Sequence, residues 1–137
     1  MQTFFLAPTR QNVGLTSVAL GVVRALQRQG LRVGFSKPVA QDDSASERSI
    51  HFAREICQVN CPNALSMTQV VSRISAGEID ELLEDIVSLC MTAAQGADVL
   101  VIEGLHTDAS FSFTTRLNAD IARSLQAEMV LVASAQE

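Results

Sequence analysis

The segment LAPTRQNVGLTS, residues 6–17, has the outline of a phosphate-binding loop, because a short apolar run precedes it and an amphipathic stretch follows it. Backbone N–H groups at the start of a helix carry a partial positive charge and form an anion site. Gly14 permits the close approach of a phosphate, and the hydroxyl group of Thr16 or Ser17 can contact a phosphate or a metal ion. The segment therefore predicts a site for an anion.

Two positions of this loop depart from the consensus G-x-x-x-x-G-K-[ST]. Counting back from Gly14, Thr9 stands at the first glycine position, and Leu15 stands where the consensus has lysine. A leucine cannot neutralise the charge of a β- or γ-phosphate. The alternative, which these residues leave open, is a plain strand-to-helix turn that Asn12 or Thr16 caps and that binds no ligand.

Two further segments carry polar groups that could act beside this loop. Lys37 follows an apolar run directly and could reach the same ligand, although a solitary surface lysine is the simpler interpretation. Asp42 and Asp43 could hold Mg²⁺ through water, although a solvated acidic loop is favoured. Glu103 ends another apolar run, where nucleotide-binding folds often place an acidic residue; its plainer role is to cap nearby backbone.

Strands and helices that alternate along the chain must position these residues. Continuous apolar runs without polar alternation indicate parallel strands that are buried on both faces, and the period of 3.6 indicates helices. The predicted strands are 3–7, 31–38, 98–102 and 129–133, and the predicted helices are 14–29, 46–59, 68–74, 77–96 and 114–127.

This order predicts a three-layer α/β fold, with a parallel sheet covered by helices on both faces. Ligands of such sheets bind beyond the carboxyl ends of the strands. We therefore expect segments 7–17, 37–43 and 103–107 to meet at one edge of the sheet.

Composition narrows the class of protein. The 137 residues are 47% hydrophobic and 18% charged, which is typical of one globular domain. The net charge of -5 argues against a nucleic-acid surface, and no apolar run approaches the roughly 20 residues of a membrane span. The first residues lack the pattern of a signal peptide, so a cytoplasmic protein is expected.

The three cysteines, Cys57, Cys61 and Cys90, are expected to be reduced thiols, because an odd number cannot form a closed disulfide framework. No second pair of cysteines or histidines completes a zinc site, so we expect no metal. Cys90 falls on the apolar side of a predicted helix and is expected in the core.

The last predicted strand, 129–133, is followed by only four residues. A buried parallel strand needs cover on both faces. We therefore expect this chain to be a domain, or part of one, from a longer polypeptide, or to be covered by another chain in an oligomer.

Several segments carry a family resemblance in the same order along the chain. The stretch APTRQNVGLTSVALGVVRALQRQGLRVGFSKPVAQ resembles the amino-terminal region of the long bacterial phosphate acetyltransferases, and VLVIEGL and LNADIARSLQAEMVLVAS continue the resemblance. It covers essentially the whole chain and is loosest over residues 42–77. The family's domain is similar in turn to dethiobiotin synthetase, which implies a P-loop NTPase-like fold.

That similarity assigns roles to individual positions. Pro8 takes the position of the first loop glycine of dethiobiotin synthetase, Gly14 the second, and Leu15 the position of its catalytic lysine. Thr16 keeps the hydroxyl position. Lys37 matches a second active-site lysine, and the pair Glu103-Gly104 matches the acidic strand end.

The resemblance implies a function for the parent protein. Phosphate acetyltransferases exchange an acetyl group between acetyl-CoA and phosphate, with catalytic residues in a carboxy-terminal domain that this chain lacks. The amino-terminal domain is associated with regulation by metabolites and with the oligomer. The tentative ligand-binding set is Thr9, Asn12, Gly14, Thr16, Ser17, Lys37 and Glu103, with no catalytic residue and no cofactor.

Two alternatives stay open at this point. One is an ATP-dependent ligase resembling dethiobiotin synthetase, against which Leu15 is the main argument. The other is an interaction module whose altered loop binds nothing.

Overall fold

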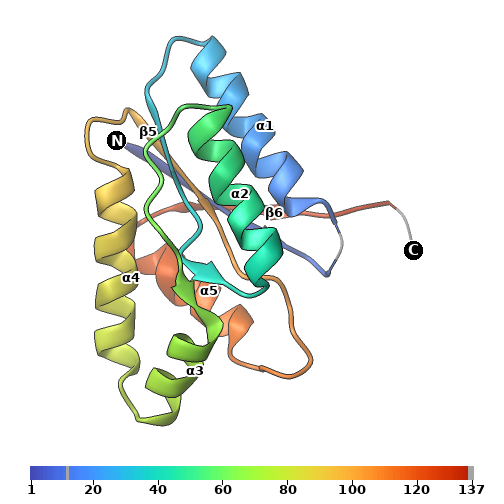
Figure 1. The fold of residues 1–137 in the computed structure, drawn as a ribbon, viewed down its shortest axis with the longest axis vertical. Coiled ribbons are helices and arrows are strands. Elements are labelled where there is room, and N and C mark those ends of the chain that lie inside the picture. The colour runs from blue at the N-terminus through green and yellow to red at the C-terminus, as the bar shows by residue number, and fades with distance from the viewer. Residues whose placement is uncertain (12, 136–137) are drawn as a thin grey trace.

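Alternating strands and helices build a parallel sheet between two helical layers, as Figure 1 shows for this computed structural model. The structure describes residues 1–11 and 13–135, with residues 43–47 described by their backbone only. The strands are β1 (Gln2–Pro8), β2 (Val33–Ser36), β3 (Val39–Ala40), β4 (Leu65–Ser66), β5 (Val99–Glu103) and β6 (Glu128–Val132). The helices are α1 (Leu15–Arg28), α2 (Asp43–Glu55), α3 (Met67–Ser75), α4 (Ile79–Ala93) and α5 (Thr114–Ser124).

The main sheet has the order β2-β5-β1-β6, and all its pairs are parallel. Phe5 at the centre of β1 is in register with Ile102 of β5 and with Met129 of β6. The carboxyl ends of β1, β2 and β5 therefore lie at one edge. The predicted fold class is confirmed.

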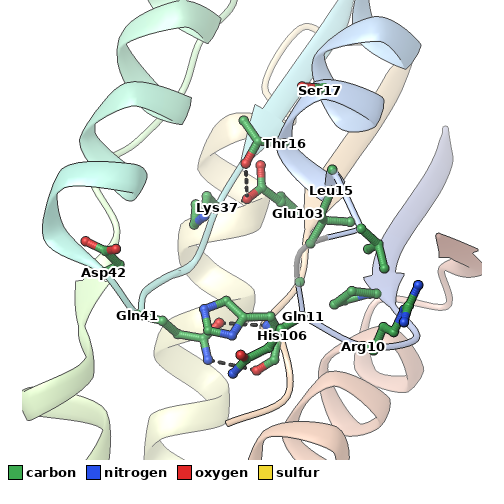
Figure 2. Close-up of a pocket in the computed structure, with 14 residues that line it drawn as sticks. Arg10, Gln11, Leu15, Thr16, Ser17, Lys37, Gln41, Asp42, Glu103 and His106 are labelled. Carbon is green, nitrogen blue, oxygen red and sulfur yellow. Dashed lines mark hydrogen bonds and ion pairs between the residues drawn. The ribbon is translucent and has the colours of Figure 1, made fainter. Parts of the chain in front are cut away.

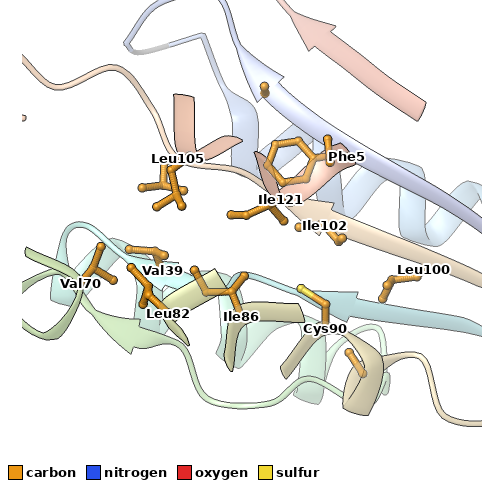
Figure 3. Close-up of a cluster of buried hydrophobic side chains, with 14 of the residues drawn as sticks. Phe5, Val39, Val70, Leu82, Ile86, Cys90, Leu100, Ile102, Leu105 and Ile121 are labelled. Carbon is orange, nitrogen blue, oxygen red and sulfur yellow. The ribbon is translucent and has the colours of Figure 1, made fainter. Parts of the chain in front are cut away.

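Successive residues of the central strands point to opposite faces and build two cores. On one face, Phe5, Leu100 and Ile102 share a core with side chains of α3, α4 and α5, which Figure 3 shows in close-up. On the other face, Leu6 and Val101 share a core with side chains of α1 and α2. This double burial explains why the sequences of β1 and β5 are apolar without alternation.

The ends of α1 follow from two glycines. Gly14 precedes the helix with φ 79°, and Gly30 follows it with φ 84°. Residues with a Cβ rarely adopt this left-handed backbone, so the glycines favour a turn at each end. The predicted helix over 14–29 is confirmed.

Three details differ from the sequence-based predictions. The helix predicted at 46–59 is α2 and covers Asp43–Glu55, and the two-residue strands β3 and β4, which pair in a small separate sheet, were not predicted. The strand predicted at 129–133 exists as β6, but its side chains are largely exposed within these 137 residues, with Leu131 67% exposed. Within the described residues, β6 pairs with β1 alone.

Across the part of the chain that the structure describes, none of the helices combines the length and apolar character needed to cross a bilayer.

Candidate functional site

The three segments expected to meet do enclose a common cavity, at the carboxyl ends of β1, β2 and β5 (Figure 2). Its volume is about 370 Å³. The loop between β1 and α1 lines one side, the segment after β2 another, and the segment after β5 a third. The lining residues are Pro8, Arg10, Gln11, Val13, Gly14, Leu15, Thr16, Ser17, Lys37, Gln41, Asp42, Glu103, Gly104 and His106.

The start of α1 lines this cavity with Gly14, Leu15, Thr16 and Ser17. Gly14 is the residue that precedes the first turn, and it has no side chain with which to cap the helix. The alternative in which Thr16 caps the turn is wrong, because its hydroxyl donates to Glu103 Oε2 at 3.1 Å and lies 3.2 Å from Ser49 Oγ. Asn12, the other predicted cap, lies outside the described residues. The first N–H groups of a helix have no partner within it, so this start is suited to an anion.

Lys37 and Glu103 form a buried ion pair at the cavity wall. Lys37 Nζ donates to Glu103 Oε2 at 2.5 Å, and Figure 2 shows the carboxylate beside both Lys37 and Thr16. Lys37 is 8% exposed and Glu103 is 2% exposed. The interpretations of a solitary surface lysine and of a backbone-capping carboxylate are therefore wrong. Each charge offsets the cost of burying the other.

The second oxygen of this carboxylate has no partner. Among the described residues, Glu103 Oε1 is the buried side-chain polar atom that lacks a hydrogen bond. Buried polar atoms are nearly always paired, and an exception calls for an explanation. This oxygen has almost no accessible surface, so it is left without a donor inside the protein.

Charges in the cavity wall balance. Arg10 and Lys37 are cationic, whereas Asp42 and Glu103 are anionic, and Leu15 adds no charge where the consensus has lysine. Leu15 instead packs against the core shared by α1 and α2. A free nucleoside triphosphate, which carries several negative charges, is therefore poorly matched here.

Thr9 does not line the cavity, although it belongs to the predicted ligand-binding set. Its N–H donates to the carbonyl oxygen of Val132 at 2.9 Å, and its hydroxyl donates to the same oxygen at 3.3 Å. Thr9 thus ties the loop to the end of β6. Gln11 ties the loop to the segment after β5, because its Nε2 donates to the carbonyl oxygen of Thr107 at 2.6 Å.

A second pair of contacts joins the segments that follow β2 and β5. Gln41 Nε2 donates to the carbonyl oxygen of His106 at 2.9 Å, and the N–H of His106 donates to Gln41 Oε1 at 2.7 Å. Neither residue was among the predicted site residues. The only available signal was that each lies in a segment expected to reach the sheet edge.

Asn118 of α5 holds the segment after β5 in place through two hydrogen bonds to the backbone of Leu105. Its Oδ1 accepts from the N–H of Leu105 at 2.8 Å, and its Nδ2 donates to the carbonyl oxygen of Leu105 at 2.7 Å. Gly104 allows this approach, because a Cβ there would lie 2.5 Å from the ring of Phe5 and 3.0 Å from Asn118 Oδ1. Sequence analysis missed Asn118, since an asparagine in a helix carries no distinctive signal.

A metal site has less support than an anion site. Asp42 lines the cavity and is exposed, and the side chain of Asp43 is outside the description. Among the residues that the structure describes, no group of three or more His, Cys, Asp or Glu side chains is suited to hold a metal ion.

Comparisons with known proteins agree with this architecture. A family model described as an AAA domain matches residues 2–137. The signal recognition particle receptor FtsY from Elizabethkingia anophelis has a similar fold, with a TM-score of 0.65 over 96% of this chain and 41% of that chain at 16% identity. The fold is thus P-loop NTPase-like.

Curated relatives are phosphate acetyltransferases. Those from Pseudomonas putida and Deinococcus radiodurans are 44% and 43% identical to this chain, over 98% of it in each case. The one from Escherichia coli is 35% identical over 94% of it. The chain spans about a fifth of the length of these relatives. The chain therefore belongs to the AAA domain family, and its relatives there are the amino-terminal domains of long phosphate acetyltransferases.

Proposed function

We propose that this chain is a non-catalytic domain of a phosphate acetyltransferase that binds a small anion at the start of α1. Acetyl transfer between acetyl-CoA and phosphate then belongs to a carboxy-terminal catalytic domain of the same polypeptide. The bound anion is a metabolite that regulates this activity. The observation that carries the proposal is one cavity lined by the glycine-preceded start of α1 and by Lys37, with Leu15 where phosphoryl chemistry needs a cation.

The missing cation argues against the ligase alternative. Phosphoryl transfer depends on positive charge held at the migrating group, and loss of one such contact costs on the order of 3 kcal/mol of transition-state stabilisation. Leu15 removes that charge, and Lys37 is already paired with Glu103. Both features favour binding without turnover.

The proposal also covers the oligomeric state of the protein and its location in the cell. The protein is a cytoplasmic homo-oligomer in which this domain contributes to assembly. The domain uses no cofactor.

Anion binding is tested by calorimetric titration of inorganic phosphate into the chain and two glycine variants. In Gly14→Ala, the added methyl group obstructs the approach of the anion, and we expect binding at least tenfold weaker. Gly77→Ala is the matched control, because Gly77 has a similar φ of 76°, equally open space and no place in the cavity wall. Each substitution costs about 1–2 kcal/mol of backbone strain.

Both variants are expected to show the same loss of stability, whereas only Gly14→Ala loses affinity. Equal phosphate affinity in the wild type and Gly14→Ala would contradict the proposed site. Equal losses in both variants would attribute the effect to strain rather than to the cavity.

The absence of catalysis is tested by measuring ATP hydrolysis with and without Mg²⁺. We expect no metal-dependent turnover by the wild type, because Leu15 supplies no charge at the transferred phosphate. Leu15→Lys is expected to bind ATP about tenfold more tightly than the wild type, since one opposed charge is worth about 1.5–3 kcal/mol in such a contact. Robust metal-dependent turnover by the wild type would overturn this part of the proposal.

A further inference from the structure

Thr16 and Glu103 occupy the positions that hold a metal ion in proteins with a P-loop. Such proteins bind phosphates together with Mg²⁺, which a loop hydroxyl group and an acidic residue hold in place. Thr16 follows the position of the consensus lysine, and Glu103 ends β5 next to β1. The Thr16 hydroxyl donates to Glu103 Oε2 at 3.1 Å, so the two groups lie together (Figure 2). They are the groups to which such an ion would have to bind.

Neither oxygen of the Glu103 carboxylate is available to a metal ion. Oε2 accepts from Lys37 Nζ at 2.5 Å and from Thr16, and Oε1 has under 1 Å² of accessible surface. The Thr16 hydroxyl also lies 3.2 Å from Oγ of the buried Ser49. Mg²⁺ needs oxygen ligands at about 2.0–2.1 Å in a nearly octahedral arrangement. The residues present therefore do not fit this ion.

The ammonium group of Lys37 supplies a positive charge at this position. Lys37 follows β2 and is 8% exposed, and its charge compensates that of the buried Glu103. A divalent cation here would meet a like charge at contact distance, which opposes its binding. Lys37 is also held in place, because its departure would leave a buried carboxylate without a counter-charge.

We propose that Lys37 takes the place of the divalent cation in this cavity, so that the cavity binds its anion free of metal. This inference rests on the proposed anion site for its ligand, whereas the role of Lys37 can be tested without that ligand. The class of ligand is a free phosphate group rather than a complex of phosphate with Mg²⁺. Nucleotides that bind together with Mg²⁺ are then excluded for a second reason besides Leu15.

The wild-type chain provides the first test. Calorimetric titrations with inorganic phosphate are made in EDTA and in Mg²⁺ at matched ionic strength, since salt itself weakens the binding of anions. We expect the same affinity in both solutions, because the metal has no place beside the anion. Mn²⁺ prefers the same oxygen ligands as Mg²⁺ and broadens nearby resonances. It should leave the amide resonances of Thr16 and Glu103 unchanged.

A variant of Lys37 tests the role of the ammonium group directly. Lys37→Ala frees Glu103 Oε2 and removes the like charge, so Mn²⁺ should bind beside Thr16 about tenfold or more tightly than in the wild type. Arg10→Ala is the matched control and should gain no such site, because Arg10 lines the same cavity but donates to the carbonyl oxygen of Ser134. Addition of Glu103→Gln to Lys37→Ala should abolish the gain. Thermal unfolding establishes that each variant is folded.

The outcomes separate this inference from the proposed function. Broadening of Thr16 and Glu103 by Mn²⁺ in the wild type, or phosphate binding that requires Mg²⁺, would overturn the inference and leave the anion site standing. A folded Lys37→Ala chain that gains no Mn²⁺ binding would overturn it as well, and where this variant does not fold, the wild-type measurements decide. Absence of phosphate binding in both solutions would overturn the proposed function, and the Mn²⁺ measurements would still decide the role of Lys37.

Discussion

Cys90 has the environment of an inert thiol. It lies on the core face of α4, is fully buried, and its Sγ lies 3.7 Å from Ser36 Oγ. Burial raises the pKa of Cys90 to about 11, because the thiolate would lose its hydration, and the contact with Ser36 opposes this only in part. Since the thiolate is the reactive form, this cysteine should be unreactive while the chain is folded.

We predict that iodoacetamide alkylates Cys90 at pH 8 at least a hundredfold more slowly in the folded chain than in urea. With a pKa of about 11, only about one thousandth of the thiol is ionised at this pH, and the core also blocks access. Mass spectrometry of timed samples gives the rate at each cysteine. Equal rates in the folded and unfolded chain would contradict the burial of this residue.

The raised pKa of Cys90 also predicts how the free energy of unfolding changes with pH. The pKa of Cys90 is higher in the folded chain than its ordinary value of 9.0, so its contribution is complete below about pH 9. It is lost as the pH rises towards 11, because the unfolded chain then releases the proton more readily. Urea unfolding from pH 8 to 11 should show this decline, and Cys90→Ala should reduce its slope.

The sequence allowed individual residues of the site to be identified, but not the residues with which they interact. Lys37 and Glu103 were both identified from their places at strand ends, since parallel strands bring such positions to one edge. Their direct pairing could not be predicted, because 66 positions separate them and either side chain could have faced water. The partner of Thr9 could not be predicted either: its hydroxyl group donates to the carbonyl oxygen of Val132 in β6.

Packing of β2 against α4 depends on the absence of a side chain at Gly34. A Cβ at this position would lie 2.1 Å from the carbonyl oxygen of Ala93 and 2.9 Å from its carbonyl carbon. Both atoms belong to backbone near the end of α4, so they cannot move without shifting the helix. This contact fixes how closely the helix approaches the sheet.

We predict that Gly34→Ala lowers the free energy of unfolding by about 1–3 kcal/mol or more, the usual cost of overpacking. Gly21→Ala is the matched control, because Gly21 lies within α1 with nothing near its Cβ position. There the same substitution should stabilise the chain by about 0.5–1 kcal/mol through helix propensity. Chemical denaturation measures both, and a loss of stability in the control with none in Gly34→Ala would contradict this account.

Elements with a clear period were predictable, and short or irregular ones were not. Helix α4 keeps one apolar stripe over four turns, with Leu82, Ile86 and Cys90 buried, so its existence was plain. Strands β3 and β4 have two residues each, which is too few to show a period. The end of α2 was predicted four residues too late. Beyond that end, Gln58 has a left-handed φ of 55°, which its residue type does not predict.

Strand order is a property of the whole molecule, and periodicity does not report it. The sequence of β6 resembles that of a central strand, and within these 137 residues β6 pairs with β1 alone. Three neighbouring apolar residues, Met129, Val130 and Leu131, are 41%, 36% and 67% exposed there. An exposed apolar edge strand offers unpaired backbone groups to another chain.

We predict that the 137-residue chain associates at high concentration through β6, and that Leu131→Lys weakens this association. A lysine on an edge strand opposes pairing by its charge and hydration. Met91→Lys is the control, because Met91 is 47% exposed but lies on α4, away from the edge. Sedimentation velocity over a range of concentrations measures the effect, and equal association of both variants would place the contact elsewhere.

The central claim is that the start of α1 binds an anion in a cavity that no longer performs phosphoryl chemistry. The most direct test is a phosphate titration followed by the backbone amide resonances of the chain. We predict saturable shifts concentrated at Gly14, Leu15, Thr16 and Ser17, which line the cavity, with Lys37 and Glu103 responding as well. Shifts that do not saturate, or that scatter over the surface without including these amides, would contradict the claim.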